Sequence, residues 1–550
     1  MRWRGRVLIA LLAIGLFASG LYAARRHLIL FYVGTWARGS TPVAPNREIV
    51  WQRGPATAAT SSERRPPNIV LIIADDLGFN DISLNGGGLV PTPNIDSIAR
   101  GGVVFSRAYA GTAACAPSRA MIMTGRYGTR TGFEFTPTPP GMMRILDLFF
   151  NDGTRPHELL VDYAVAEQLP PFAEQGLPGT EITIAEALRP RGYHSIHIGK
   201  WHIGNSAPYA PLAQGFDEAV MMESGLYLPE DDPRVVNAKL PFDPIDQFLW
   251  ARMQYATSYN GGEWFEPRGY LTDFFTDEAI AAIEANRHRP FFINLAHWGV
   301  HTPLQALVDD YDALPHIADH RTRVYAAMIR ALDRGVGRVL QALADNGVAD
   351  NTLVVFTSDN GGAGYIGLPE INRPFRGWKL TFFEGGLRVP LFARWPARID
   401  AGTVVDAPVG HIDVFPTIAA AAGAALPSDR IIDGLDLKPL LDAPTAAPRR
   451  RALFWRDGHY RAVLSDGWKL QTSARPDKIW LFDLKSDPTE QTNLAERHPE
   501  VVRKLQALLT AHDATQRPPL FPAAGEMPVW IDRTLEEGGN ASDEYVYWPG

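Results

Sequence analysis

The only cysteine of this 550-residue chain, Cys115, lies in a segment whose residue types suit the chemistry of anions. It opens the string Cys115-Ala-Pro-Ser-Arg119, and Pro117 ahead of an apolar run predicts a helix that starts just after the cysteine. Free N–H groups at a helix start favour an anion and would lower the pKa of a thiol. A lone cysteine is otherwise most often a small buried hydrophobic residue.

Acidic residues follow two apolar runs, which points to a cation. Asp75 and Asp76 come after residues 68–74, and Asp359 with Asn360 comes after residues 351–358. Carboxylates brought together would raise one another's pKa unless a cation neutralised them. Oxygen ligands favour calcium or magnesium over zinc. An Asp pair after a strand is otherwise a common turn or helix-cap device.

A lysine and a histidine follow a third apolar run. Lys200 and His202 come after residues 193–198, two positions apart. Side chains so placed can point into one pocket, where they would act as a charge clamp and as an acid or base. As isolated residues they would more often be ordinary surface groups.

Two further histidines, His297 and His301, are four residues apart, a spacing also found in zinc-binding helices. Here the second position of that motif is Trp298 instead of glutamate, and Gly299 and Pro303 disfavour a helix. A zinc protease site is therefore excluded.

The elements that would position these residues alternate between strand and helix along the chain. Continuous apolar runs predict buried strands at residues 68–74, 103–109, 193–198, 290–296 and 351–358. The alternation predicts an α/β fold with a large, mostly parallel sheet flanked by helices, whose polar side chains converge at the carboxyl edge. After residue 442, short strands and a helix at residues 499–512 predict a smaller C-terminal antiparallel sheet plus helix.

The chain therefore divides into five predicted parts. They are an N-terminal signal anchor or signal peptide (residues 1–36), a linker (37–66), a catalytic domain (67–442), a C-terminal subdomain (450–512), and a tail rich in proline and acidic residues that packs on the surface (513–550).

The N-terminus predicts export from the cytoplasm. Residues 7–24 carry no charge and lie between arginines, which predicts an extracytoplasmic protein on the periplasmic or secretory side. The length fits a cleaved signal or an uncleaved membrane anchor, and the arginines that follow favour the anchor slightly. The net charge of −8 excludes a chain-wide basic surface for nucleic acid.

Three motifs carry a resemblance to a known family. The string from Cys115 to Gly125 matches C-x-P-S-R-x-x-x-x-T-G, residues 192–202 match G-Y-x-S-x-x-x-G-K followed by an aromatic residue and histidine, and residues 383–390 match F-E-G-G-x-R-V-P. Over roughly residues 66–512 the chain resembles the type I, formylglycine-dependent sulfatases, arylsulfatase-like members of the alkaline-phosphatase-like superfamily.

The resemblance implies a modified nucleophile and a metal ion. A formylglycine-generating enzyme would oxidise Cys115 to formylglycine (3-oxoalanine), whose hydrate attacks sulfur, and Arg119 would steady that hydrate. One calcium ion would be bound by Asp75, Asp76, Asp359 and Asn360, with the modified Cys115 as a further ligand. Magnesium remains open as the alternative ion.

The resemblance also assigns the remaining polar residues. Lys200 would hold the sulfate oxygens, and His202 would assist removal of the hydrate proton that ejects sulfate. His301 and Lys379 are both candidates for protonating the leaving oxygen, and the choice between them stays open.

The implied activity is hydrolysis of sulfate monoesters, either aryl or carbohydrate. An alternative is a phosphonate monoester or phosphodiester hydrolase, because such esters carry the same single negative charge. A remote alternative is an inactive protein that binds sulfated glycans. Aromatic residues in two long insertions, at residues 133–179 and 205–267, suit sugar or aryl rings but would equally pack the loops.

Overall fold

The computed structural model describes residues 25–26, 28–36, 39–58, 65–139, 141–442 and 452–550. The apolar segment at residues 7–24, expected to be a signal or anchor, lies outside these residues. Among the residues described, no helix is both long enough and apolar enough to cross a membrane.

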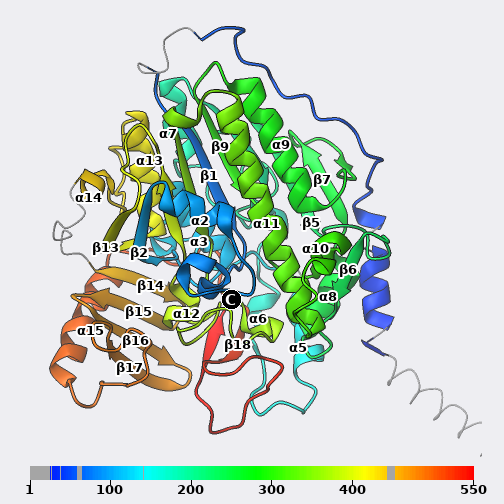
Figure 1. Cartoon of the computed structure of the whole chain (residues 1–550). Helices are drawn as coiled ribbons and strands as arrows, with labels where there is room; N and C mark the ends of the chain where they lie inside the picture. The colour runs from blue at the N-terminus through cyan, green and yellow to red at the C-terminus, as the bar shows by residue number, and fades with distance from the viewer. Residues whose placement is uncertain (1–24, 27, 37–38, 59–64, 140, 443–451) are drawn as a thin grey trace, which may run out of the picture.

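A ten-stranded sheet forms the centre of the molecule (Figure 1). Its middle strand, β1 (Asn68–Ala74), pairs in parallel with β11 (Thr352–Ser358) on one side and with β9 (Phe291–Ala296) on the other. The full order is β13-β2-β12-β11-β1-β9-β4-β5-β7-β8. Antiparallel pairing is confined to β12, β7 and β8, so the prediction of a mostly parallel sheet is confirmed. The remaining strands are β2 (Val103–Tyr109), β4 (His194–Gly199), β5 (Glu218–Gly225), β7 (Tyr255–Tyr259), β8 (Trp264–Phe265), β12 (Leu391–Arg394) and β13 (Thr403–Gly410).

Alternate residues of β1 face two separate hydrophobic layers. Val70 and Ile72 pack in the layer that includes α2 (Pro93–Arg100), α9 (Leu271–Asn286) and α11 (His320–Asp345). Leu71 and Ile73 pack in the layer that includes α3 (Cys115–Thr124), α7 (Ile184–Leu188) and α13 (Val414–Ala422). Because both faces are covered, the strand is apolar at every position from Ile69 to Ala74.

A second, smaller sheet follows in sequence, as predicted. It is antiparallel and runs in the order β14-β15-β16-β17, with α15 (Pro499–Asp513) packed against it. The Asp466-Gly467 pair joins β15 to β16 with positive φ angles of 56° and 89°, as a tight hairpin turn requires. The strands are β14 (Leu453–Asp457), β15 (Tyr460–Ser465), β16 (Trp468–Ala474) and β17 (Asp477–Asp483).

The C-terminal tail adds two strands of its own. β18 (Gly525–Trp530) lies between β19 (Tyr545–Pro549) and β3 (Leu160–Val161), and both pairings are antiparallel. The tail is therefore tied by main-chain hydrogen bonds to the first long insertion. The other elements are β6 (Val235–Ala238), β10 (Leu304–Leu307), α4 (Gly128–Thr131), α5 (Met142–Phe150), α6 (Tyr163–Ala166), α8 (Pro244–Arg252), α10 (Val308–Asp312), α12 (Glu384–Leu387) and α14 (Lys438–Asp442).

Candidate active site

The acidic residues meet because β1 and β11 end at the same level. Ala74 is the register partner of Ser358, so the residues that follow each strand leave the sheet side by side. The main-chain N–H of Asp359 donates to the Ala74 carbonyl at 3.1 Å, and the N–H of Asp76 donates to the Asp359 carboxylate at 3.2 Å. Asp75, Asp76 and Asp359 are all buried.

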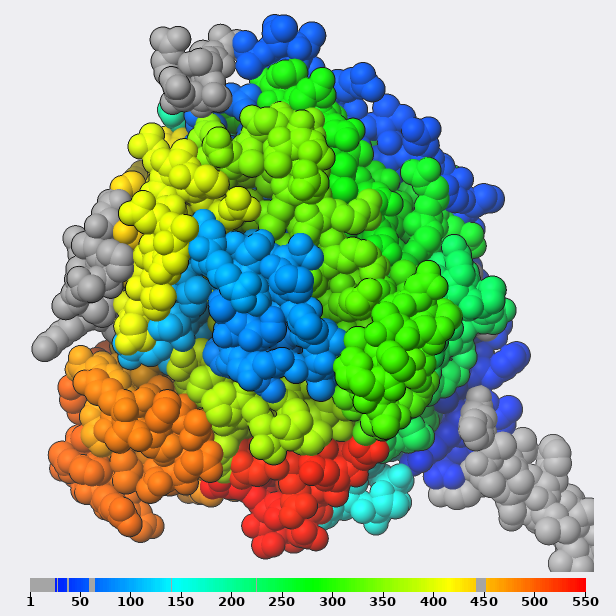
Figure 2. All heavy atoms as spheres, in the orientation of Figure 1, coloured from blue at the N-terminus to red at the C-terminus, as the bar shows by residue number. Residues whose placement is uncertain are grey.

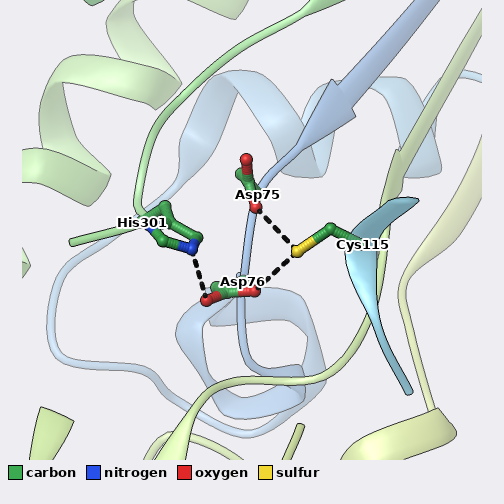
Figure 3. A group of neighbouring side chains, drawn as sticks. All are labelled: Asp75, Asp76, Cys115 and His301. Atoms are coloured by element: carbon green, nitrogen blue, oxygen red, sulfur yellow. Dashed lines mark hydrogen bonds and ion pairs between the residues drawn. The ribbon is translucent and has the colours of Figure 1, made fainter. Parts of the chain in front are cut away.

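Cys115 lies against this acidic cluster (Figure 3). Its Sγ is 3.6 Å from Oδ1 of Asp75 and 3.7 Å from Oδ1 of Asp76. The cysteine is itself the first residue of α3, so the prediction that the helix starts after it was wrong by one residue. The expected low thiol pKa was also wrong, because burial and the charge of Asp359 raise the pKa of Cys115 despite the helix start.

Arg119, one helical turn after Cys115, links three parts of the site. Its Nε donates to Oδ2 of Asp359 at 2.8 Å, and its Nη2 is 3.2 Å from Oδ2 of Asp75. Its Nη1 donates to the main-chain carbonyl of Lys200 at 3.0 Å. A buried guanidinium with three such partners fixes the acidic cluster relative to the segment that carries Lys200.

Lys200 and His202 are brought to the same edge of the sheet after β4. The Lys200 Nζ lies 2.6 Å from Oδ2 of Asp75. His202 has a φ of 64°, a conformation rare for residues other than glycine, and such strain is typical of functional sites. Burial, and then the charges of Lys200 and Arg119, lower the pKa of His202 well below its usual value, so its ring is neutral. Its Nδ1 is buried without a hydrogen-bond partner in the described part of the chain.

Lys379 and His301 approach the cluster from the other side. The Lys379 Nζ lies 2.9 Å from the Asp76 carboxylate and 3.4 Å from Nε2 of His301. The Nδ1 of His301 lies 2.7 Å from the Thr302 carbonyl, an acceptor, so Nδ1 carries the proton and Nε2 presents its lone pair to Lys379. His297 is buried elsewhere and joins none of these contacts.

Two residues of this site escaped the sequence analysis. The Tyr365 hydroxyl donates to Oδ2 of Asp76 at 2.8 Å and accepts from the Lys379 Nζ at 3.1 Å. Ser118, a motif residue without an assigned role, donates to the main-chain carbonyl of Asp359 at 2.6 Å and contacts Nδ1 of His411 at 3.0 Å. The only signal for Tyr365 was a tyrosine in the glycine-rich segment after Asn360.

The cluster has the ligand atoms that a hard divalent cation requires. Ligand atoms of Asp75, Asp76, Cys115 and His301 all lie within 4.8 Å of one another. The Asn360 Oδ1 is buried and has no hydrogen-bond donor among the described residues. Several carboxylate oxygens with a free amide oxygen fit calcium or magnesium, so the residues present are compatible with such an ion.

The aromatic residues of the insertions mostly pack inside the protein. Tyr227 is completely buried, and its hydroxyl lies within donating distance of two carbonyls, that of Trp298 at 3.0 Å and that of His301 at 2.9 Å. Phe135 and Trp250 are also buried. From the sequence, these rings could either contact a sugar or aryl ring or pack the loops. These three residues pack inside the protein.

Comparison with known proteins gives matches over most of the chain. The sulfatase family model matches residues 67–424, and the model of the N-sulphoglucosamine sulphohydrolase C-terminal region matches residues 377–515. Human N-acetylgalactosamine-6-sulfatase is 34% identical over 69% of this chain and 67% of its own length. Mouse steryl-sulfatase is 31% identical over 86% of this chain and 85% of its own length.

Solved structures share the fold. The crystal structure of Ps i-CgsB in complex with k-i-k-neocarrahexaose matches with a TM-score of 0.69 and 29% identity. The match covers 83% of this chain and 95% of that one. The structural match therefore covers most of both chains, and the two family models together match residues 67–515.

Proposed function

This chain belongs to the sulfatase family of sulfuric ester hydrolases, and we propose that it cleaves sulfate monoesters with a formylglycine nucleophile made from Cys115. The observation that carries this proposal is the position of the Cys115 side chain, 3.6 Å and 3.7 Å from two strand-end carboxylates and on a helix that also carries Arg119. An unmodified thiol of raised pKa would be a poor nucleophile there, which favours a nucleophile formed by modification.

We propose that Asp75, Asp76, Asp359 and Asn360 hold one calcium ion with the modified residue. The hydrated aldehyde would supply the attacking hydroxyl, and the bound ion would neutralise charge on the sulfate. Lys200 and Lys379 pair with Asp75 and Asp76 in this structure, so both ammonium groups lie where they could turn to sulfate oxygens. Arg119 holds the carboxylates in place through its contacts with Asp75 and Asp359.

Lys379 is our choice for the residue that protonates the leaving oxygen. Burial lowers the pKa of His301 to about 3, more than Asp76 can offset, so the imidazole carries no extra proton near pH 7. Although burial opposes the charge of Lys379, the carboxylate of Asp76 raises its pKa well above the usual value. The Nε2 of His301 presents its lone pair to the Lys379 Nζ at 3.4 Å, so Lys379 is the proton donor of this pair and His301 orients it. His202, which is neutral, is the candidate base for the hydrate proton.

Two further assignments rest on the sequence. We propose that a formylglycine-generating enzyme acts on this chain, because the segment from Cys115 to Gly125 carries the full motif. We also propose an extracytoplasmic location, with attachment to the membrane through residues 7–24.

The experiment that tests the function compares an aryl sulfate with an aryl phosphodiester. The full chain is produced with a formylglycine-generating enzyme, and conversion of Cys115 is verified by peptide mass. We expect the sulfate ester to be the better substrate by kcat/KM. The Cys115→Ala variant is the control and should retain the thermal midpoint of unfolding while losing turnover.

Each other outcome has a distinct meaning. A clear preference for the phosphodiester would leave the nucleophile assignment unchanged. It would support the alternative function, a phosphonate monoester or phosphodiester hydrolase. No turnover of either ester by converted protein, together with calcium-dependent binding of sulfated glycans, would support the inactive binding protein. Turnover by the Cys115→Ala variant would refute the nucleophile.

A further inference from the structure

A small cavity beside Lys379 is lined mainly by apolar side chains. Its volume is about 40 Å³, room for about three water-sized groups. Beyond Lys379 and Tyr365 of the site, the lining side chains that matter here are Phe150, Ile245, Trp378, Met527, Val529 and Trp530. The cavity therefore lies next to the site, with Lys379 and Tyr365 common to both.

The polar groups of the lining limit which ligands would fit. The Asp243 carboxylate already accepts the N–H groups of Ile245 at 2.9 Å and Asp246 at 3.2 Å. The indole N–H groups of Trp378 and Trp530 are buried with no acceptor in the described part of the chain. The Arg533 guanidinium also lines the cavity and pairs with Asp543 at 2.7 Å. A ligand oxygen that only accepts can be satisfied by the indole groups, whereas a hydroxyl that must also donate would depend on Asp243, whose two oxygens each already accept one main-chain N–H.

The C-terminal tail supplies one wall of this cavity. Met527, Val529 and Trp530 belong to β18. From β19, Trp548 packs against Ala114, the neighbour of Cys115, and against Leu380, the neighbour of Lys379. Figure 2 shows the tail, in red, pressed against the yellow-green part of the chain that includes α12.

The tail from β18 onward lies outside the regions that the two family models match. The matched regions end at residue 515, so β18 and β19 lie outside both. Trp378 is accommodated beside the cavity because residue 364 is glycine, since a Cβ there would lie 2.7 Å from the indole ring. The apolar wall therefore depends on Gly364 and on a tail segment outside both matched regions.

We propose that this cavity receives the ring edge next to the sulfated carbon, and that the substrate is the sulfate ester of an apolar alcohol whose sulfated carbon belongs to, or is attached to, an alicyclic or aromatic ring. This inference rests on the proposed function and narrows its substrate class. A polyhydroxylated sugar would leave hydroxyl groups unsatisfied against Met527 and Val529. An apolar pocket discriminates against an added hydroxyl by up to about 10²-fold.

A competition assay on the converted full-length protein tests this inference. Turnover of 4-nitrophenyl sulfate is measured while cyclohexylmethyl sulfate or galactose 6-sulfate is added as the competitor. Both competitors carry the sulfate on a CH₂ attached to a six-membered ring, so they differ mainly in hydroxyl groups. We expect cyclohexylmethyl sulfate to compete at a concentration about 10²-fold lower.

Two matched variants test whether the difference between the two competitors arises at the cavity. Val529 and Val546 are register partners in β18 and β19, but only Val529 lines the cavity. Val529→Thr should reduce the ratio of the two inhibition constants several-fold, whereas Val546→Thr should leave that ratio unchanged.

Equal competition, or stronger competition by galactose 6-sulfate, would overturn the inference and leave the proposed function standing. So would an unchanged ratio in Val529→Thr. No turnover of 4-nitrophenyl sulfate by fully converted protein would instead remove the proposed function, and this inference with it.

Discussion

The hydroxyl of Ser118 donates a 2.6 Å hydrogen bond to the main-chain carbonyl of Asp359. This contact joins the helix that begins at Cys115 directly to the loop that carries Asp359 and Asn360. The same hydroxyl accepts the N–H of Gly111 at 3.2 Å. Ser118 therefore holds α3 and the loop of Asp359 and Asn360 at a fixed separation.

Ser118→Ala should lower both the free energy of unfolding and the affinity for the metal. The substitution leaves the Asp359 carbonyl without this donor, and a buried unsatisfied group costs about 1–3 kcal/mol. Chemical denaturation measures the loss, and a calcium titration measures the affinity. Ser486→Ala, at an exposed position, is the control and should cost less than about 0.5 kcal/mol. Equal behaviour of the two variants would show that the Ser118 contact is unimportant.

Asp359→Asn should weaken binding of the divalent cation by at least about tenfold. The substitution removes one charge from the group of carboxylates that would hold the ion. Metal content after dialysis, measured by mass spectrometry, is the readout. Asp333→Asn is the matched control, because Asp333 is also buried but accepts the main-chain N–H groups of Asn94 and Ile95 far from the site. If both variants retained the ion equally, the ligand assignment would fail.

Asp457→Asn should change how stability depends on pH. Asp457 accepts hydrogen bonds from the Thr112 hydroxyl and the Trp548 indole, and burial raises its pKa from 3.8 to about 7. A carboxyl with a raised folded-state pKa stabilises the fold fully below pH 3.8, and that contribution is lost as the pH rises to about 7. Thermal midpoints between pH 4 and 7 should therefore fall less steeply in the variant. Equal slopes of the thermal midpoint against pH in the unsubstituted protein and in Asp457→Asn would contradict this prediction.

Lys469→Met should destabilise the contact between the two sheets. The Lys469 Nζ is completely buried, 2.9 Å from Glu384 and 3.0 Å from Glu490. Removal of the ammonium group leaves the buried Glu490 carboxylate without a cation, while Glu384 keeps its pair with Arg388, and breaking such a buried pair costs about 3–5 kcal/mol. Urea unfolding gives the value. Lys504→Met removes an exposed ion pair with Asp466 and should cost at most about 1 kcal/mol. If both variants lost only this small amount of unfolding free energy, the buried ion pairs of Lys469 would not contribute to the stability of the fold.

Much of the fold could be predicted because its signals are local. The continuous apolar run from Ile69 to Ala74 predicts a strand covered on both faces, and β1 occupies the centre of the sheet. α7 likewise begins at a local signal, the capping box of Thr183 and Glu186.

The start of α3 and the thiol pKa of Cys115 were predicted incorrectly. A thiol pKa inferred from the start of a helix reflects only the dipoles of nearby main-chain groups. It omits the desolvation of a side chain that is 3% exposed, and the charges of carboxylates from two distant strands. Both depend on tertiary packing.

The sequence by itself determined the residue types of the site, the order of its elements and the motif around Cys115, because these depend on neighbours within a few positions. Only the tertiary structure decided that Tyr365 contacts Asp76, that Ser118 contacts Asp359, and that the tail lies beside Lys379. Such contacts join residues up to hundreds of positions apart. They are set by strand register and by the burial of two surfaces at once, which no local pattern encodes.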